Sequence, residues 1–586
     1  MIRSQDNAPY DVVIIGGGPG GSTTGALLKK YAPELRVLIL EKERFPREHV
    51  GESQLPPISA VLQEMGCWDK VEAANFPIKI GATYTWGDTT DPWDFEFLPI
   101  GDIKPDEARP AKYEGWRVQT AFQVERSIYD KILLDHAAEL GCEVREETRV
   151  AKVHAEGDRV TGLELETGEV VAARHYIDAT GAVATLRRAM GVKIDAPTLL
   201  RNVAFWDYWE NAEWAEEIGV GATRVHIRSL GYGWLWFIPL GPTRTSIGLV
   251  CPADHYKQTG KRPEEIYLEA IQSERFVSAL TASATRDGPV RSTTDWSFVV
   301  DRTYGENWFL VGESAGFADP ILAAGLTLTQ TGARELAYTI LELERGELDR
   351  DWLLERYDEL QLRRVRQHMR FADYWYSANG YFDDIRENCS AIAKESGLKL
   401  DAADAFRWLA QGGLGDDAPG QVGVGGMDVA GVKQMMQRFS GSDAKWTING
   451  KNTFKLNLVS AKETTIGKLV DGRIHTAPCY VRGKSRLPLL GVQGLVVEAL
   501  RASSDAEGIL EHLRAELSKT LAPEHVPVSV HHAIQTLEVM ANDYWVICGV
   551  KKNKPVLNVT TPEEGSQIHT HDANSPSARR IPATEA

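Results

Sequence analysis

Residues 11–22 read DVVIIGGGPGGS, an apolar run that leads without interruption into a turn of glycine and proline. The β-branched run predicts a buried parallel strand, and residues 22–30 after the turn predict a helix. Gly16, Gly18 and Gly21 have the G-x-G-x-x-G spacing. Such a strand, turn and helix are typical of a dinucleotide site, because the glycines let the backbone approach a pyrophosphate and the helix N-terminus faces it.

A second apolar run, residues 37–40, ends at Glu41. This carboxylate comes about 20 residues after Gly21, where a dinucleotide fold places the acidic residue that accepts hydrogen bonds from the adenosine ribose. The spacing favours a cofactor site over a purely structural glycine turn.

Length and composition describe an ordinary globular protein. The chain has 586 residues, enough for two or three domains, of which 43% are hydrophobic and 25% charged. Its net charge of −17 argues against a nucleic-acid partner, since phosphates would be repelled. No apolar run is long enough to cross a bilayer, and the N-terminus lacks the apolar core of a signal peptide. We therefore expect a cytoplasmic protein without a membrane partner.

Histidine and cysteine patterns predict no metal site. The six cysteines are far apart and include no C-x-x-C pair, which favours free thiols. His569 and His571 form an H-x-H pair near the end of the sequence, but no further ligand residues cluster with them.

Two later segments indicate FAD rather than NAD. Residues 176–181 read YIDATG and residues 309–320 read FLVGESAGFADP, and each apolar run ends in a turn of small residues. Both resemble FAD-contacting turns of the aromatic hydroxylase superfamily, which implies that Asp178, Gly312 and Glu313 contact the cofactor. In that family the acidic residue of the second turn, usually aspartate, binds a ribityl hydroxyl. The sequence has no second fingerprint for NAD(P)H, so we expect a separate flavin reductase to supply reduced FAD.

Two segments resemble flavin-dependent halogenases. Residues 45–56 read FPREHVGESQLP, which is similar to the family's FPR-x-x-V-G-E-S segment and implies that Arg47 and Ser53 contact the cofactor. Residues 123–130 read QVERSIYD, which resembles the family's Q-V-x-R stretch and implies that Arg126 lies beside the flavin phosphates or ring. A plain surface ion pair is the alternative for Arg126.

Residues 233–239 read GWLWFIP and reproduce the W-x-W-x-I-P pattern of flavin-dependent halogenases. We expect a strand that forms a hairpin with residues 245–250, and its period of two places Trp234 and Trp236 on one face. The resemblance implies that this tryptophan pair lies near the flavin and keeps the substrate away from it. Two ordinary core tryptophans are the alternative.

Lys79 lies in the segment NFPIKIGA, residues 75–82, where the halogenase family carries its lysine. If the side chain is buried, loss of solvation lowers the pKa of its amine. A neutral amine would form a haloamine, whereas an ammonium would donate a hydrogen bond to hypohalous acid, and the sequence leaves both open. An exposed lysine at a strand edge is the alternative.

The segment PILAAG, residues 320–325, matches the family's halide-binding turn and is called the halide turn below. Relatives often have serine or threonine before the glycine, whereas Ala323 and Ala324 carry no hydroxyl. Backbone N–H groups at Ala324 and Gly325 would still hold an anion. A plain turn at the start of a helix is the alternative. Tryptophan halogenases have glutamate where Leu322 stands, so the sequence favours the phenol and pyrrole subgroups.

The predicted fold is α/β, with one Rossmann-type FAD domain and an antiparallel sheet on the substrate side. This core covers residues 8–378, with the sheet inserted at about 190–295. Residues 379–562 predict a C-terminal α+β domain with a glycine-rich loop at 412–426, and residues 563–586 predict a disordered tail.

The resemblance implies that reduced FAD, oxygen and halide produce hypohalous acid, which passes to Lys79 and halogenates an electron-rich phenol, pyrrole or indole. That substrate would be either free or attached to a carrier protein. One alternative is an FAD-dependent monooxygenase or a reductase of isoprenoid double bonds, neither of which needs Lys79 together with the tryptophan pair. Another is a non-catalytic flavoprotein that binds a carrier-tethered substrate, which the departures at Ala323, Ala324 and Glu313 would permit.

Overall fold

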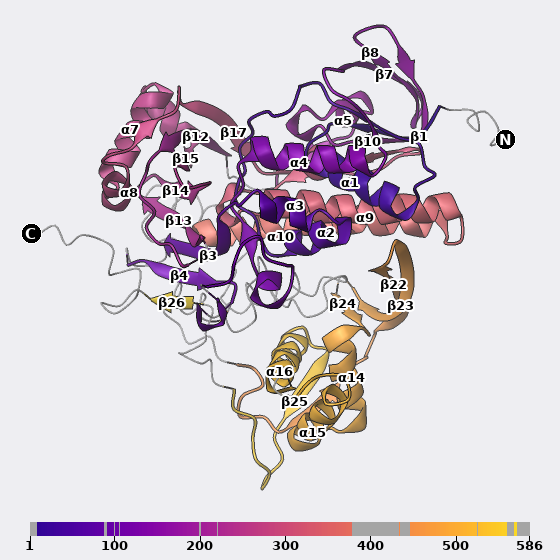
Figure 1. Cartoon of the computed structure of the whole chain (residues 1–586). Helices are drawn as coiled ribbons and strands as arrows, with labels where there is room; N and C mark the ends of the chain where they lie inside the picture. The colour runs from indigo at the N-terminus through magenta and orange to yellow at the C-terminus, as the bar shows by residue number, and fades with distance from the viewer. Residues whose placement is uncertain are drawn as a thin grey trace, which may run out of the picture. The chain divides into compact units, whose positions relative to one another are not determined.

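The computed structural model contains two compact units (Figure 1). The first consists of Met1–Gly397, Asp471–Arg473 and His569–Ala586, and the second of Leu398–Val470 and Ile474–Ile568. The residues that the structure describes are 9–86, 91–98, 100–104, 106–197, 201–219, 221–377, 433, 446–483, 485–523, 526–559 and 568–570.

A five-stranded parallel sheet of the first unit has the strand order β19-β10-β1-β2-β6. Its strands are β1 (Tyr10–Ile15), β2 (Val37–Leu40), β6 (Glu143–Arg145), β10 (Ala173–Asp178) and β19 (Trp308–Leu310). Ile15 pairs with Leu40 on one side and with Asp178 on the other. The predicted glycine turn, Glu41 and Asp178 therefore meet at the carboxyl edge of the sheet, where open α/β sheets bind ligands.

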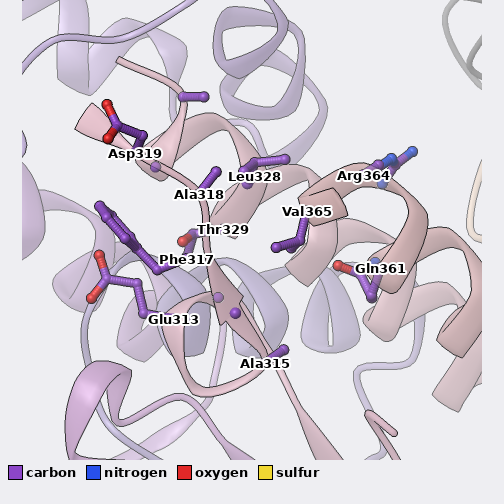
Figure 2. Close-up of a pocket in the computed structure, with 14 residues that line it drawn as sticks. Glu313, Ala315, Phe317, Ala318, Asp319, Leu328, Thr329, Gln361, Arg364 and Val365 are labelled. Carbon is purple, nitrogen blue, oxygen red and sulfur yellow. The ribbon is translucent and has the colours of Figure 1, made fainter. Parts of the chain in front are cut away.

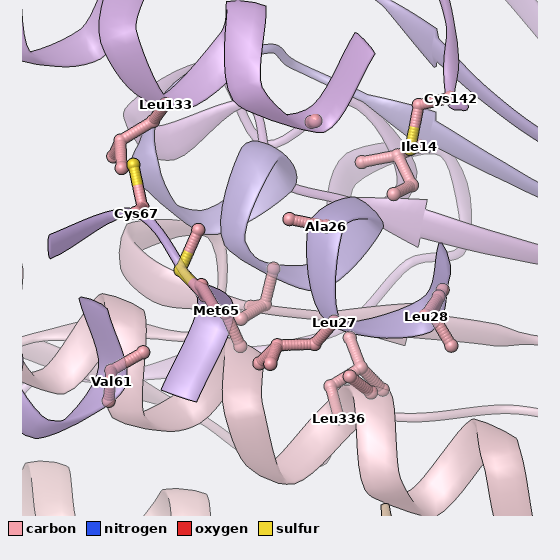
Figure 3. Packing of buried hydrophobic residues seen from close by; sticks show 14 of the residues in the cluster. Ile14, Ala26, Leu27, Leu28, Val61, Met65, Cys67, Leu133, Cys142 and Leu336 are labelled. Carbon is pink, nitrogen blue, oxygen red and sulfur yellow. The ribbon is translucent and has the colours of Figure 1, made fainter. Parts of the chain in front are cut away.

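Side chains of β1 alternate between two hydrophobic cores. Val12 and Ile14 pack in a core with α1 (Pro19–Tyr31), α4 (Arg126–Glu139) and α9 (Gly325–Arg345). Figure 3 shows Ile14 and Leu336 in this core, with the α1 side chains between them. Val13 and Ile15 pack in the other core, with helix α10 (Arg350–Ser377) and a small sheet of β7 (Val150–Glu156), β8 (Arg159–Leu165) and β9 (Val170–Val171). The parallel sheet is thus covered on both faces, as its continuous apolar strands require.

The remaining elements beside this sheet are short. They are α2 (Pro57–Met65), α3 (Trp68–Ala73), α5 (Thr185–Ala189), β11 (Ile194–Asp195), β18 (Phe298–Val300) and β20 (Gly316–Phe317).

A ten-stranded sheet forms the other part of the first unit, with the main order β16-β12-β15-β14-β13-β3-β4-β26. β17 also pairs with β12, and β5 with β3. The strands are β3 (Ile78–Thr85), β4 (Trp93–Glu96), β5 (Ala121–Phe122), β12 (Arg201–Glu210), β13 (Ala222–Leu230), β14 (Gly233–Pro239), β15 (Arg244–Pro252), β16 (Thr285–Arg286), β17 (Arg291–Trp296) and β26 (Ile568–Thr570).

The predicted hairpin around the tryptophan pair is confirmed, since β14 and β15 are antiparallel with Trp236 opposite Gly248. The sheet is wider than the expected insertion at about 190–295, because β3 and β4 come from an earlier part of the chain. β3 pairs with β13 in parallel, whereas most neighbours in this sheet are antiparallel. A pairing between strands so distant in sequence leaves no local signal in the residues themselves.

One face of the ten-stranded sheet is covered by three helices, α6 (Ala253–Thr259), α7 (Pro263–Ser273) and α8 (Arg275–Leu280). Leu235 and Phe237 of β14 belong to the core beneath them. Alternation along β14 therefore directs Trp234 and Trp236 to the opposite face, called the inner face below.

The second unit contains strands and helices in its described residues. They are β21 (Thr453–Leu456), β22 (Lys462–Val470), β23 (Arg473–Arg482), β24 (Ser485–Pro488), α14 (Gly491–Ala502), α15 (Ala506–Leu517), α16 (Val526–Asn542) and β25 (Val546–Gly549).

Two strands of this unit pair with each other although they are distant in the sequence. β21 and β25 are antiparallel, with Phe454 opposite Cys548. The residues after Ser504 form α15, which begins after Asp505 as N-cap, and the Asp505 side chain makes no capping hydrogen bond. The glycine-rich loop at 412–426 lies outside the described residues.

Within the described ranges, no helix combines the length and apolar character needed to cross a membrane. Five free cysteines lie in these ranges, and four of them are buried.

Gly16 tests the glycine turn, because its φ is +106° and an added Cβ would lie 2.4 Å from the Ala179 carbonyl oxygen. We expect Gly16→Ala to lower the free energy of unfolding by about 2 kcal/mol or more, from backbone strain and this clash. Gly231→Ala is the control, since a Cβ there meets open space. Urea unfolding curves of the two variants would contradict the account if their midpoints coincided.

Candidate active site

The glycine turn is held from inside by Glu41. The Gly17 N–H donates to Glu41 Oε2 at 2.7 Å, and the Glu43 N–H donates to Oε1 at 2.9 Å. Helix α1 then begins at Pro19 with no acidic residue in its first turn and no side-chain cap. Its first N–H groups and dipole therefore face an anion-binding position, as expected for a pyrophosphate.

Three predicted cofactor turns lie close together, and the Gly312 turn lines a cavity. Cβ atoms added at Gly20 and Gly312 would both lie about 3 Å from the Thr329 side chain of α9, so these turns pack on the same residue. A Cβ added at Gly181 would lie 3.8 Å from Glu313 Oε2. The lining includes Gly312, Glu313, Asp319, Ala324, Gly325 and Thr329 (Figure 2). The halide turn therefore opens onto the cavity that the Gly312 turn lines.

The Asp178 carboxylate is surrounded by hydrogen-bond donors of its own chain. Its Oδ1 accepts from the Thr180 N–H and hydroxyl, and its Oδ2 accepts from the N–H groups of Leu186 and Arg187. Four donors of the chain occupy this buried carboxylate, so it shapes the turn at the end of β10. A direct contact to a cofactor through this side chain has no support in the structure and stays a prediction.

Arg126 lies in a buried charge cluster, not in the surface ion pair that was the alternative. Its guanidinium binds both Asp130 carboxylate oxygens at 2.7 and 2.9 Å and donates to the Val50 carbonyl at 2.9 Å. Burial lowers the pKa of Arg126, but the charges of Asp130, Glu52 and Glu313 outweigh burial and raise it overall. Arg47 approaches Asp130 from the glycine-turn side at 3.4 Å.

Several buried polar atoms without partners lie next to Glu52 and near Arg126 in the sequence. Within the described residues, Ser53 Oγ and both polar side-chain atoms of Gln54 and Gln123 have no hydrogen-bond partner. Ser53 and Gln123 face each other across an isolated β-bridge. Buried polar atoms are nearly always satisfied, so this group fits a polar ligand that supplies both donors and acceptors.

Each indole of the tryptophan pair has its own hydrogen-bond anchor. Trp234 is 1% exposed and its Nε1–H donates to Tyr376 Oη at 2.8 Å. Trp236 is 6% exposed and its Nε1–H donates to Ser246 Oγ at 3.0 Å. The two ring centroids are 6.0 Å apart. Buried indoles with satisfied N–H groups are held in one orientation.

Ser246 in turn contacts a buried carboxyl group. Ser246 Oγ lies 3.5 Å from Glu52 Oε1, and the Tyr208 hydroxyl donates to the same oxygen at 3.1 Å. Burial raises the pKa of Glu52, against the lowering effects of Tyr208 and of the Arg126 charge. Trp236 is thereby linked, through Ser246 and Glu52, to the halogenase-like segment at residues 45–56.

Lys79 is buried within the sheet, contrary to the alternative of an exposed strand edge. It is 2% exposed on β3, and no hydrogen bond or ion pair of its amine is found within the described residues. Its Nζ lies 5.5 Å from the centroid of the Phe97 ring. Burial lowers the pKa of Lys79 to about 7. The amine can therefore exchange a proton near neutral pH.

A register shift lies beside Lys79. Thr223 pairs with Lys79 and the next residue, Arg224, pairs with Gly81, so Ile80 is an extra residue in β3. Such bulges disturb the alternation of a strand and re-aim the side chains beside them.

The sheet separates Lys79 from the tryptophan pair. Ile227 of β13 pairs with both Trp236 and Tyr84, so Trp236 is level with a residue five positions beyond Lys79. At the rise of a strand this is about 16 Å along the sheet, and the intervening β13 adds about 10 Å across it. The tryptophan pair is linked to Glu52 through Ser246 and to Asp319 through Tyr376. Lys79 lies at a different place on the sheet, away from these contacts.

The halide turn ends at the N-terminus of α9. Ala323 has the left-handed φ of +52°, and the first α-helical bond of α9 runs from the Leu328 N–H to the Ala324 carbonyl. The N–H groups from Gly325 to Thr327 precede that bond and have no acceptor within the helix. Thr327 Oγ1 is also buried, with no hydrogen-bond partner among the described residues. These donors would suit a small anion.

Several residues of the site were missed at the level of sequence. Asp319 and Tyr376 connect the halide turn to Trp234, although Tyr376 is 142 positions from that tryptophan. Glu52 lies inside a recognised motif, but nothing in the motif indicates its contact with Ser246. Within the described residues, no group of three or more His, Cys, Asp or Glu side chains could hold a metal ion.

Comparisons with known proteins agree with this geometry. A family model described as an FAD binding domain matches residues 9–372. The 1H-pyrrole-2-carbonyl-peptidyl-carrier-protein chlorinase of Pseudomonas fluorescens is 30% identical over 384 residues, which cover 64% of this chain and 85% of the relative. Tryptophan 2-halogenase of Chondromyces crocatus is 31% identical over 351 residues, which cover 58% of this chain and 62% of the relative. The solved myxobacterial chondrochloren halogenase matches with a TM-score of 0.58 at 30% identity, covering 67% of this chain and 91% of that one.

Gly248 tests the placement of Trp236, because a Cβ added there would lie 2.1 Å from the indole ring. We expect Gly248→Ala to lower the free energy of unfolding by about 1–3 kcal/mol, since the ring cannot remain in place. Gly241→Ala, in the turn between the same two strands, is the control because its Cβ meets open space. Equal urea midpoints for the two variants would show that Trp236 does not pack on Gly248.

The burial of Lys79 predicts a pH-dependent stability. Lysine in an unfolded chain has a pKa of about 10.4, so folding costs most below about pH 7, where the buried amine keeps its proton. The cost decreases as pH rises, because the folded chain binds fewer protons than the unfolded one. We expect Lys79→Met to be more stable than the parent chain by about 4 kcal/mol near pH 7 and by about 2 kcal/mol near pH 9.

Urea unfolding of the cofactor-free chain at both pH values measures this difference, with Lys257→Met as the exposed control. An advantage of Lys79→Met that stayed constant between the two pH values would show that Lys79 titrates like an exposed lysine.

Proposed function

The chain belongs to the flavin-dependent halogenases, within the FAD binding domain family, and from this membership we propose which residues hold the cofactor, the halide and the oxidant. It is an FAD-dependent oxidoreductase that uses oxygen and halide. The membership confirms the resemblance found in residues 45–56 and 233–239, and it favours halogenation over the monooxygenase and reductase alternatives.

FAD fits the cluster of turns at the carboxyl edge of the parallel sheet. We assign its pyrophosphate to Gly16, Gly18 and Gly21 at the start of α1, where N–H groups and the helix dipole favour an anion. Glu41, Gly312 and Glu313 line the adjacent adenosine and ribityl positions. When bound in its reduced form, FAD with oxygen supplies the oxidising power that converts halide into hypohalous acid.

The polar edge of the flavin fits the unsatisfied atoms of Ser53, Gln54 and Gln123. These side chains offer donors and acceptors side by side, which a heterocycle with alternating carbonyl and N–H groups can satisfy. Arg47 and Arg126 add positive charge close by, held in place by Asp130.

The halide is held at the start of α9 by the N–H groups of Ala324 and Gly325, with Thr327 Oγ1 as a further donor. This hydroxyl would compensate for those missing at Ala323 and Ala324. The position shares a cavity with Gly312 and therefore lies beside the place assigned to the cofactor.

The tryptophan pair forms a barrier between cofactor and substrate. Its two indoles are buried, in contact with each other and anchored separately, so they present a continuous aromatic surface on the inner face. The large separation of Lys79 along the sheet requires an oxidant that travels, which hypohalous acid can do and an oxidised cofactor cannot.

Lys79 positions this oxidant beside the substrate, and the single observation that carries the proposal is its burial without a charged partner among the described residues. An ammonium at Lys79 donates a hydrogen bond to the oxygen of hypohalous acid and makes the halogen more electrophilic. A pKa near 7 also permits the neutral amine. Both forms place the halogen next to the ring, and such positioning contributes most of the expected rate.

The substrate is an electron-rich aromatic ring of the phenol, pyrrole or indole type. The Pseudomonas fluorescens relative is named for a pyrrole on a carrier protein and the Chondromyces crocatus relative for tryptophan, so relatives differ in substrate. Leu322 stands where tryptophan halogenases have glutamate, which supports the phenol and pyrrole subgroups. A carrier-bound substrate is consistent with the first relative.

Further expectations from the sequence remain proposals. They are a transient flavin reductase, a cytoplasmic location, a C-terminal α+β domain, and domain boundaries at 8–378, 379–562 and 563–586.

We expect the full chain, supplied with a flavin reductase, NADH, FAD, oxygen and bromide, to brominate members of a panel of phenols, pyrroles and indoles. Lys79→Ala should lower bromination at least about 100-fold while FAD binding, followed by flavin fluorescence, stays unchanged. Lys257→Ala should retain activity, because that lysine is exposed. Mass spectrometry of the products decides, and full bromination by Lys79→Ala would remove Lys79 from the mechanism.

A further inference from the structure

The Asp319 carboxylate contacts two parts of the site at once. Its Oδ1 accepts from the Ile321 N–H at 2.9 Å, which caps the halide turn. The same oxygen accepts from the Tyr376 hydroxyl at 3.1 Å, and Asn202 Nδ2 lies 3.5 Å from Oδ2. Asp319 is 4% exposed, so these contacts are made away from bulk water.

Tyr376 carries this contact onward to the tryptophan pair. Its hydroxyl accepts from Trp234 Nε1 at 2.8 Å while it donates to Asp319. Its ring also packs edge-on against Trp86, with centroids 5.8 Å apart. A chain of three side chains thus runs from the halide turn through Tyr376 to one indole.

The second indole has no part in this chain. Trp236 is anchored by Ser246, which adjoins Glu52 on the cofactor side. A change at Tyr376 should therefore release Trp234 and leave the anchor of Trp236 intact.

We propose that Asp319 and Tyr376 are positioning residues that couple the halide turn to Trp234. One carboxylate holds the turn that binds halide and, through Tyr376, the indole that separates cofactor from substrate. Disturbing either residue loosens both, so halide affinity and the fraction of oxidant that reaches the substrate change together. This inference rests on the proposed halide site and tryptophan barrier.

The charge of Asp319 is sensitive to pH in this environment. Burial raises the pKa of Asp319 to about 7, and burial together with the Asp319 charge raises the pKa of Asp373 on α10 to about 7. Asp373 and Tyr376 are the titratable groups of α10 that face Asp319, while Glu313 and Arg364 line the same cavity. Above its pKa the carboxylate accepts all its hydrogen bonds, and below it protonation weakens the network.

Tyr376→Phe tests the coupling in the full chain. It keeps the ring beside Trp86 and removes the hydroxyl that joins Trp234 to Asp319. Tyr357→Phe is the matched control, because Tyr357 is also buried on α10 and its hydroxyl donates to the Leu310 carbonyl. The readouts are the bromide concentration at half-maximal rate and the brominated product formed per NADH consumed.

We expect Tyr376→Phe to raise the half-saturating bromide concentration about 3-fold to 10-fold and to lower product per NADH by a similar factor. Tyr357→Phe should match the parent chain in both. A change in only one readout, or in neither, would overturn the coupling. Absence of brominated product from the parent chain would instead refute the proposed function itself.

The pH dependence of the bromination rate shows whether the negative charge of Asp319 holds the network, or only the packing of its side chain. Asp373→Asn removes the negative charge beside Asp319 without touching its hydrogen bonds, so the acid limb of the bromination rate should shift to lower pH. A profile that coincided with that of the parent chain would show that the Asp319 charge does not control the network.

Discussion

The burial of polar groups on the inner face of one sheet is the constraint on which the site depends. A buried donor or acceptor without a partner costs as much as a lost hydrogen bond. The two indole N–H groups meet this constraint. Trp236 donates to Ser246 on the adjacent hairpin strand, and Trp234 donates to Tyr376, which is distant in the sequence. Lys79 does not meet it within the described residues, and the result is an amine whose pKa lies near 7. The two indoles are thus held in fixed orientations, whereas the Lys79 amine has no hydrogen-bond partner among the residues that the structure describes.

The sequence predicts the cofactor edge well, because the signals there are local. An apolar strand, a glycine turn and Glu41 all lie within residues 10–41, and the structure places them at one edge of a parallel sheet. The hairpin around Trp236 follows for the same reason, since its two strands are adjacent in the chain. The role implied for Asp178 is unsupported, because a motif does not reveal that four internal donors occupy the carboxylate.

The remaining parts of the site depend on contacts across long distances in the sequence. β3 joins the sheet beside β13, and this pairing buries Lys79 instead of leaving it at an edge. Tyr376 reaches Trp234 only because α10 ends beside the inner face. No periodicity in either segment encodes such a partner. Local motifs therefore propose residues for the chemistry, whereas the residues that would position them are visible only in the folded chain.

We propose that oxidant made at the cofactor travels inside the protein to Lys79. Bromination in the presence of increasing free methionine, which scavenges hypohalous acid in solution, distinguishes this enclosed route from escape into solvent. An enclosed route predicts that product per NADH stays constant as methionine increases. A product yield that falls in proportion to methionine, while NADH consumption continues, would show that the oxidant reaches the substrate through bulk solvent and would contradict the account.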